Sequence, residues 1–317
     1  MRKTTIPALG LLAVLVAACS TAGASTSPAA SVAPSPSTAV ASQAPSLAPS
    51  PTPDPCAKDK LALVTAGTLT IGSDNPGYPP YFAENKDGHK TAPWEGGDPT
   101  NGEGFESAVG YAIAERMGFA KADVVWIVVP FANSYAPGPK TFDFDLNQVS
   151  YKPERAQTAA LSKGYYFGNQ ALVALKTNAL ASATTIAQLK DYVYGAQVGT
   201  TSYDAIAALI APSKEARVYD TNDLAVKALG NKTIDGLVVD LPTADYITGV
   251  QIENGAATIV GQFDKGTPEY FSAVLAKASP LTPCVNAAID SLTEDGTLDT
   301  LASTWLPFQD TVPVFKP

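Results

Sequence analysis

The sequence predicts an α/β fold in which helices cover both faces of mostly parallel sheets. Between residues 57 and 317, short apolar runs of strand length alternate with segments that carry apolar residues at helical spacing. Such alternation is typical of sheets that have helices on both faces. No repeat with a fixed period of 20–50 residues is visible. At 317 residues, the chain is long enough for two domains.

Strands are predicted where short apolar or β-branched runs end at polar or turn-forming residues. The run at 124–129 is almost wholly apolar, as expected of a buried parallel strand. The predicted strands cover residues 68–72, 124–129, 142–149, 171–175, 196–199, 217–219 and 234–239. Ligands of such sheets bind beyond the carboxyl ends of the strands, so the residues that directly follow strands are the first candidates for a site.

Helices are predicted where apolar residues recur every three or four positions. One helix covers 105–117 and ends at Gly118, and the last begins near Thr282, which can cap it with Pro283 at the first helical position. The other predicted helices cover residues 57–64, 186–192, 202–210 and 222–229.

The first 18 residues have the pattern of a secretory signal peptide. Arg2 and Lys3 precede an apolar stretch at 6–18, which is too short for a permanent membrane span. The sequence VAACS at 16–20 resembles a bacterial lipobox, which implies that Cys19 is lipidated and anchors the protein to the outside of the cell membrane, at the cell surface or in the periplasm. The alternative is an ordinary signal peptide with an incidental cysteine.

Residues 19–55 are predicted to be a linker. Of the 36 residues from 20 to 55, 30 are serine, alanine, proline or threonine, and Asp54 is the only charged residue. Such a segment buries too little apolar surface to offset the entropy of ordering it. Its prolines favour extended backbone, so we expect a tether between the lipid and the folded part.

The charge balance excludes one class of partner. Removing Arg2 and Lys3 from the 21 basic residues leaves 19 against 30 acidic residues, a net charge of −11. A nucleic-acid surface needs basic patches, so no nucleic-acid partner is expected. No apolar run reaches the length that spans a bilayer, which excludes a polytopic membrane protein.

Two cysteines remain after Cys19. Cys56 and Cys284 lie at opposite ends of the folded part, and in an oxidising compartment such a pair is expected to form a disulfide. Two buried free thiols are the alternative. No metal site is expected, because His89 is the only histidine and no CxxC spacing occurs.

Seven segments, in order, resemble one family. They are GTLTIG (67–72) with YPPY (78–81), GFE (104–106) with AERMG (114–118), DFDLNQVS (143–150) with ER (154–155), GYY (164–166), VGTT (198–201), VVD (238–240) and DGTL (295–298). The chain therefore resembles the extracellular solute-binding proteins that serve polar amino-acid ABC importers and have the type 2 periplasmic-binding fold.

That resemblance implies two α/β lobes, each a mostly parallel sheet flanked by helices, joined by two hinge strands. Residues 56–172 and 272–317 are expected to form lobe 1, and residues 173–271 lobe 2. The two hinge strands are expected near 171–175 and 271–275, and rotation about them closes the lobes on a ligand.

The resemblance also implies the ligand-binding residues. Arg155 is expected to bind the carboxylate of an amino acid with its planar fork, and Asp240 the ammonium. Thr200 and Thr201, between a strand and a helix, add donors to the carboxylate. The remaining expected residues are Tyr78 and Tyr81 as an aromatic wall, and Gln148 and Ser150 at the floor.

Each assignment has a structural alternative. Arg155 could instead be a surface residue at a helix start, and Asp240 a turn or cap residue. Thr200 and Thr201 could be helix caps only, and Tyr78 and Tyr81 could be packing residues. Trp94 and Glu95, in an insertion at 86–103 that holds the histidine as well, either cover the cleft or lie in a solvated loop. Lys152 replaces the usual threonine of the family, and either favours an acidic ligand or points to solvent.

The expected function is that of a monomeric receptor without catalytic residues or cofactor, which delivers an amino acid or a close relative to an ABC permease. An enzyme of the same fold, of a dehydratase or lytic type, is one alternative. Glu106 and Glu269 are the candidate acids for it, although the sequence shows no partner for either. A sensory binding module is the other alternative.

Overall fold

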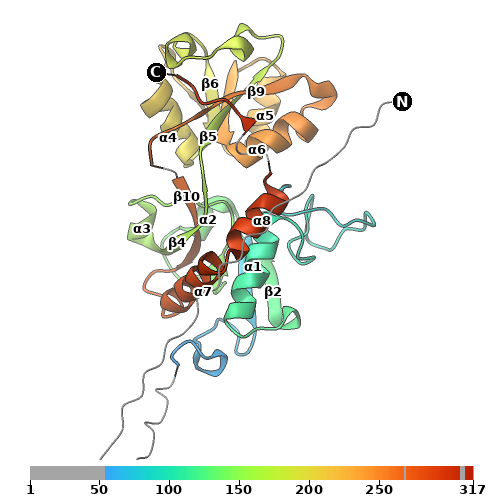
Figure 1. The fold of residues 1–317 in the computed structure, drawn as a ribbon, viewed down its shortest axis with the longest axis vertical. Coiled ribbons are helices and arrows are strands. Elements are labelled where there is room, and N and C mark those ends of the chain that lie inside the picture. Colours follow the sequence, from blue (N-terminus) through green and yellow to red (C-terminus); the bar gives the residue numbers. More distant parts are fainter. Residues whose placement is uncertain (1–53, 268, 308–310, 317) are drawn as a thin grey trace, which may run out of the picture. The chain divides into compact units, whose positions relative to one another are not determined.

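The computed structural model describes residues 54–267, 269–307 and 311–316. The predicted signal peptide, Cys19 and almost all of the predicted linker lie outside these residues. The described residues form two five-stranded sheets, each with helices packed against it (Figure 1). None of the described helices is long and apolar enough to cross a membrane.

The first sheet has the order β2-β1-β3-β10-β4 and defines lobe 1. Its strands are β1 (Leu69–Ser73), β2 (Val124–Val128), β3 (Phe144–Asp145), β4 (Ala159–Gly168) and β10 (Glu269–Ala276). The first three are parallel, whereas β10 is antiparallel to β3 and β4, so the sheet is mixed.

Three helices cover the first sheet: α1 (Phe105–Arg116), α7 (Thr282–Glu294) and α8 (Thr297–Trp305). Figure 1 shows α7 and α8 beside α1. Apolar residues of α1 and α7, such as Ile113 and Ile289, are buried in one core with the strands. Gly118, in the left-handed conformation at φ +82°, ends the turn after α1 as expected. The short helices α2 (Phe131–Ser134) and α3 (Arg155–Thr158) lie in connections of the same lobe.

The second sheet has the order β7-β6-β8-β5-β9 and defines lobe 2. Its strands are β5 (Gln170–Leu175), β6 (Tyr194–Gln197), β7 (Arg217–Tyr219), β8 (Gly236–Asp240) and β9 (Ala257–Phe263). The strands β6, β7 and β8 are parallel, and β5 is antiparallel to both β8 and β9. The two lobes therefore share one topology.

Helices α4 (Thr201–Ala205), α5 (Asn222–Gly230) and α6 (Leu241–Tyr246) accompany the second sheet. Alternate residues of β5 face two separate cores: Val173 packs in the core with α5 and α6, and Leu172 in the core on the opposite face. The two-lobed α/β fold with mostly parallel sheets that the sequence predicts is confirmed: in each sheet four strands run in the same direction, and only β10 or β5 is antiparallel to its neighbours.

The chain passes from lobe 1 to lobe 2 at Asn169 and returns between Phe263 and Glu269. The expected lobe boundaries, 172/173 and 271/272, fall inside β5 and β10, a few residues beyond these crossings. The C-terminal segment also differs from the expected division, because Val314 pairs with Gln262 of β9 and the Phe315 ring packs in a lobe 2 core.

Several predicted elements are shorter than expected. The segment at 57–64 forms only the 3-10 helix Lys58–Lys60, and the amide of Val64 is held by the Asp143 carboxylate instead of by a helix. The predicted strand at 142–149 is reduced to Phe144–Asp145, because the chain turns at Gln148, whose φ is +48°.

The helices of lobe 2 and the start of α7 also differ from the predictions. The segment at 186–192 forms the 3-10 helix Ile186–Leu189, and α4 continues as the π-helix Ile206–Ile210. A second π-helix, Ile247–Gln251, follows α6, and short 3-10 helices occupy Lys121–Asp123, Ala179–Ser182 and Glu253–Gly255. Thr282 does not cap α7 but is its first residue.

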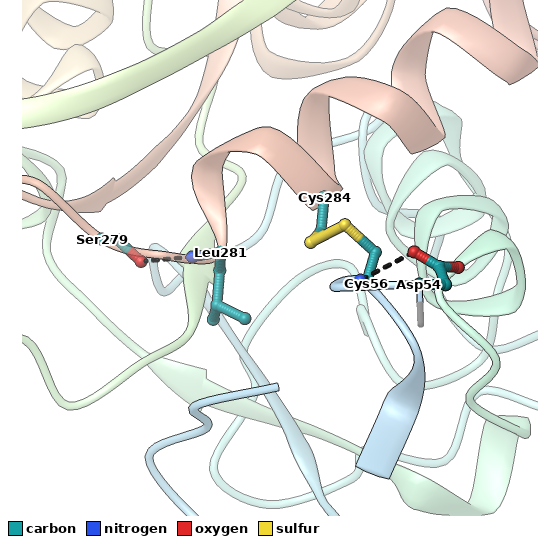
Figure 2. The surroundings of a disulfide bond; sticks show 5 residues. All are labelled: Asp54, Cys56, Ser279, Leu281 and Cys284. Carbon is teal, nitrogen blue, oxygen red and sulfur yellow. Dashed lines mark hydrogen bonds between the residues drawn. A yellow bond between two sulfur atoms is a disulfide. The ribbon is translucent and has the colours of Figure 1, made fainter. Parts of the chain in front are cut away.

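The structure contains the disulfide that the sequence predicted, between Cys56 and Cys284 (Figure 2). It joins the segment before β1 to the first turn of α7. The Asp54 carboxylate accepts a hydrogen bond of 2.8 Å from the amide of Cys56. The bridge therefore fixes the start of the folded part to lobe 1.

Candidate functional site

A cavity lies between the two lobes and is lined by residues of both. Lobe 1 contributes the end of β1, the loop after it, α2 and the segment before α3, whereas lobe 2 contributes the ends of β6 and β8 and the starts of the helices α4 to α6. The lining residues are Ser73, Asp74, Pro76, Gly77, Tyr78, Phe82, Phe131, Asn147, Gln148, Ser150, Arg155, Gln197, Thr200, Thr201, Asn222, Asp240 and Thr243. This place, beyond the carboxyl ends of parallel strands, is where α/β folds bind ligands.

Arg155 is a buried cation on the wall of this cavity. Arg155 is the first residue of α3 and is 5% exposed. Its guanidinium carbon lies over the rings of Phe131 and Tyr135, at 5.3 and 4.6 Å from their centroids. One terminal nitrogen donates to the carbonyl of Ser150, and the other donates to the carbonyl of Gly199 in lobe 2 at 2.8 Å. The surface alternative for Arg155 is therefore wrong.

These bonds leave donors free on Arg155. A guanidinium carries five N–H groups, and two of them are used by the carbonyls. Nε is buried and has no hydrogen-bond partner among the described residues. Burial lowers the pKa of the guanidinium, although an arginine still stays charged. Its remaining N–H groups can bind an anion such as a carboxylate.

Asp240 is the carboxylate that faces the cavity from lobe 2. It is the last residue of β8 and the residue before α6, but its side chain makes no capping bond to that helix. It accepts a hydrogen bond of 2.6 Å from the Gln170 side-chain amide. Burial, reinforced by the nearby Glu269, raises the pKa of Asp240 to about 7. A cation bound beside it would favour the charged form.

Thr200 and Thr201 line the cavity where β6 leads into α4. Thr200 caps α4, because its hydroxyl accepts a bond of 3.3 Å from the amide of Tyr203 and donates to the carbonyl of Gln197 at 2.8 Å. The hydroxyl of Thr201 lies 3.3 Å from that of Ser150 in lobe 1. Thr200 is thus engaged as a cap, whereas Thr201 faces the other lobe.

The two predicted aromatic residues lie differently. Tyr78 lines the cavity and its ring centroid is 6.1 Å from that of Tyr246 in lobe 2. Tyr81 is 1% exposed and does not line the cavity; its ring packs near Phe271 and its hydroxyl lies 3.1 Å from that of Thr243. Tyr81 therefore belongs to the core below the site, as its packing alternative stated.

Gln148 and Ser150 both line the cavity, as predicted for its floor. The amide of Gln148 donates to the buried Glu106 carboxylate at 2.8 Å, and its side chain donates to the same carboxylate. The Tyr165 hydroxyl is a third donor to Glu106, whose pKa is nevertheless raised to about 7 by burial. Glu106 thus has partners, and it supports the cavity floor from below.

Sequence reasoning missed several lining residues, of which Asp74 and Asn222 carry the most chemistry. Asp74 follows β1 directly, and its carboxylate accepts hydrogen bonds from the amides of Asn75 at 2.8 Å and Phe131 at 3.2 Å. Burial raises its pKa. Asn222 is the first residue of α5. The rule that residues after strands form sites could have found Asp74, whereas Asn222 follows a short exposed strand and gives little signal.

Lys152 does not line the cavity. Its ammonium forms an ion pair with Asp204 of α4, on the other lobe, and its side chain is 22% exposed. It therefore contributes to contacts between the lobes, and the expectation that it favours an acidic ligand has no support from its position.

The insertion at 86–103 supports the cavity from outside. Trp94 is 4% exposed and belongs to the lobe 1 core, so the solvated-loop alternative is wrong for it. Glu95 is exposed, but its amide donates to the Asn75 side chain at 2.8 Å and its carbonyl accepts from the amide of Gly77 at 3.0 Å. His89 is exposed, with its ring nitrogen paired to Asp87. The insertion thus braces the loop that carries Tyr78.

No group of three or more histidine, cysteine, aspartate or glutamate residues is arranged to hold a metal ion in the part of the chain that the structure describes.

Comparisons with known proteins identify the family and agree with the two-lobed fold. Residues 69–308 match the family described as bacterial extracellular solute-binding proteins, family 3. No curated protein matches the chain. Among solved structures, a substrate-binding protein of an ABC uptake transporter from Streptococcus pneumoniae with bound histidine is similar, with 25% identity, a TM-score of 0.59, and coverage of 78% of this chain and 95% of that one.

Two further structures show the same fold. An ancestral arginine-binding protein bound to glutamine has a TM-score of 0.61 at 24% identity, over 76% of this chain and 99% of that chain. The arginine-, lysine-, histidine-binding protein from Geobacillus stearothermophilus has a TM-score of 0.60 at 18% identity, over 76% of this chain and 95% of that chain.

Proposed function

This chain belongs to family 3 of the bacterial extracellular solute-binding proteins, and on that basis we propose that it is the receptor of an ABC importer that captures an amino acid in the cavity between its two lobes. The observation that carries the proposal is the placement of a buried arginine and a carboxylate in one cavity. Arg155 faces it from lobe 1 and Asp240 from lobe 2. Both residues follow from the family resemblance, and both line the same cavity.

This pair of charges suits a free amino acid. An amino acid is a zwitterion, and burying it without partners for both charges is costly. The free N–H groups of Arg155 can bind the carboxylate, with Thr201 as a further donor. Asp240 can bind the ammonium. Two charge-assisted bonds at roughly 1.5–3 kcal/mol each, together with buried apolar contact, suffice for micromolar affinity, which needs about −8 kcal/mol.

The cavity also favours a particular kind of side chain. Its charged lining residues are Asp74, Arg155 and Asp240. When the zwitterion occupies Arg155 and Asp240, Asp74 is left over as a hydrogen-bond acceptor. A cationic or amide side chain would supply the donors for it. Histidine, glutamine and arginine, which the similar proteins bind, have side chains of this kind.

The distribution of contacts supports capture of the ligand by closure of the two lobes. Arg155 reaches the carbonyl of Gly199, and Ser150 reaches Thr201, so the floor of one lobe touches the other beside the cavity. A ligand that bridges Arg155 and Asp240 adds contacts that exist only when the lobes are closed, and differential binding of this kind shifts the population to the closed state. Delivery to an ABC permease and anchoring through Cys19 complete the proposal.

The test is a thermal-shift panel of the free amino acids on the purified protein, followed by calorimetry of each hit. A ligand at 100 times its Kd adds about 2.7 kcal/mol to the stability of the fold. We expect arginine, lysine, histidine or glutamine to raise the melting temperature. A panel in which no amino acid raises it would refute the proposal, and turnover of a bound ligand would favour the enzyme alternative.

A further inference from the structure

Gln170 lies at the first crossing between the lobes and touches both. It opens β5 directly after Asn169, and its side chain is almost fully buried, at 1% exposure. The side-chain nitrogen lies 2.6 Å from Asp240, 3.1 Å from Glu269 and 3.3 Å from the Thr201 hydroxyl. An amide nitrogen has two hydrogens, so the two carboxylates, at shorter distance and with negative charge, are its partners.

Glu269 lies at the second crossing, as the first residue of β10. It belongs to the sheet of lobe 1, whereas Gln170 and Asp240 belong to neighbouring strands of lobe 2. Its side chain is 15% exposed and pairs with Lys265 in the segment that crosses between the lobes. The side chains of Asp240, Gln170 and Glu269 therefore form a hydrogen-bonded row that runs from the cavity to both crossings.

In this hydrogen-bonded row, two carboxylates lie around one amide. Reversing the amide would place its oxygen against two negative groups, so only the observed orientation is compatible with ionised carboxylates. The oxygen of the Gln170 amide is buried and has no hydrogen-bond partner among the described residues. Its burial without a partner costs free energy, and the two bonds to carboxylates offset that cost.

The groups that face Asp240 have opposite signs. Arg155 from lobe 1 favours its charged form, and so does the bond from Gln170. Glu269 is a like charge that disfavours it, and Lys265 pairs with the oxygen of Glu269 that Gln170 does not contact. Tyr81 and Tyr166 also lie within electrostatic range of Asp240 and are neutral.

We propose that Gln170 and Glu269, one at each crossing between the lobes, are positioning residues for Asp240, which set the orientation and the charge of the carboxylate that binds the ligand ammonium. This inference rests on the proposed function for the role of Asp240. Its consequence is that ligand affinity falls with acidity, and that the pH at which it falls is fixed by residues that do not line the cavity.

Two substitutions at these positions shift that pH in opposite directions. Glu269→Gln removes the like charge and lowers the pKa of Asp240. Gln170→Met keeps the volume of the side chain but removes the donor to the charged form, which raises that pKa. For a carboxyl of pKa about 7, a fall of about one unit raises the ionised fraction at about pH 6 from roughly one-tenth to one-half, which is a gain of about fivefold in affinity.

The experiment measures the Kd of L-arginine by calorimetry between about pH 5.5 and pH 8.5. L-arginine is the probe because its side chain keeps its charge throughout this range. We expect Glu269→Gln to bind more tightly than the unmodified protein at the acid end and equally at the alkaline end, and Gln170→Met to bind more weakly at neutral pH. Asp290→Asn is the matched control, because Asp290 is also paired with a lysine, Lys163, but lies on α7 outside the cavity.

A second measurement separates this inference from the proposed function. The carboxyl carbon of Asp240 reports its ionisation in the ligand-free protein by NMR, whichever ligand the protein takes. We expect its midpoint to fall in Glu269→Gln, to rise in Gln170→Met and to stay constant in Asp290→Asn. Equal midpoints in all four proteins would overturn the inference even if L-arginine binds, and shifted midpoints without any amino-acid binding would sustain the coupling and refute the receptor.

Discussion

Replacing Arg155 by lysine tests the arginine-carboxylate contact while keeping the charge. The two terminal nitrogens of Arg155 already donate to the carbonyls of Ser150 and Gly199. Three N–H groups of the guanidinium remain, and Arg155 lines the cavity. An ammonium has three donors around one atom, so it cannot serve both carbonyls and also bind a carboxylate through two parallel bonds.

The expected loss of ligand affinity follows from the number of N–H donors that lysine lacks. At least one charge-assisted hydrogen bond to the ligand disappears in Arg155→Lys, which costs roughly 1.5–3 kcal/mol. At 1.4 kcal/mol per factor of ten, affinity for the ligand found in the panel falls about 10- to 150-fold. The ligand-free protein should also lose stability, because the carbonyl of Ser150 or Gly199 loses its donor.

Calorimetry measures the affinity and urea unfolding measures the stability of the same samples. Arg116→Lys is the matched control, since Arg116 lies on the surface of lobe 1 and pairs with Asp295. It should leave the affinity unchanged. An Arg155→Lys protein whose affinity stays within threefold of the unmodified protein would show that Arg155 does not bind the ligand carboxylate.

Three further perturbations have defined outcomes. Asp240→Asn should weaken binding at about pH 8 by tenfold or more. It should also remove the fall of affinity at acid pH, because the carboxyl with the raised pKa is absent. An affinity that still falls at acid pH, measured by calorimetry, would contradict this. Lys152→Met should weaken binding about 1.5- to 5-fold at low salt and less at high salt, since its partly exposed pair with Asp204 contributes roughly 0.2–1 kcal/mol; a loss that does not depend on salt would contradict the ion pair. Replacing Cys56 and Cys284 by serine opens a loop with a sequence separation of 228 and should cost about 5 kcal/mol of unfolding free energy on the chain-entropy model, with unfolding in urea as the measurement; a change below about 1 kcal/mol would contradict the role of the bridge.

The elements that could be predicted from the sequence are those whose local pattern agrees with their tertiary surroundings. The apolar face of α1 and its stop at Gly118 are visible in the spacing of residues, and the same face is buried against the sheet. The strand after Ile234 is a short apolar run, and β8 is buried on both faces. Arg155 and Asp240 came from a family pattern, and both line the cavity.

The elements that could not be predicted are set by long-range contacts. Nothing near Trp94 indicates that the insertion packs into the lobe 1 core, because its partners lie elsewhere in the chain. Tyr78 and Tyr81 are three residues apart in one loop, yet only the first faces the cavity. The return of Phe315 to lobe 2 is invisible locally, since a single aromatic residue near the C-terminus has no periodic pattern around it.

Blocked derivatives of the ligand test whether Arg155 and Asp240 together bind a zwitterion, because each derivative lacks one of its two charges. Calorimetry should compare the free amino acid found in the panel with its N-acetyl derivative, which has no ammonium for Asp240, and its amide, which has no carboxylate for Arg155. Both blocked derivatives should bind at least about tenfold more weakly than the free amino acid. Equal affinity of the free amino acid and either derivative would contradict this expectation.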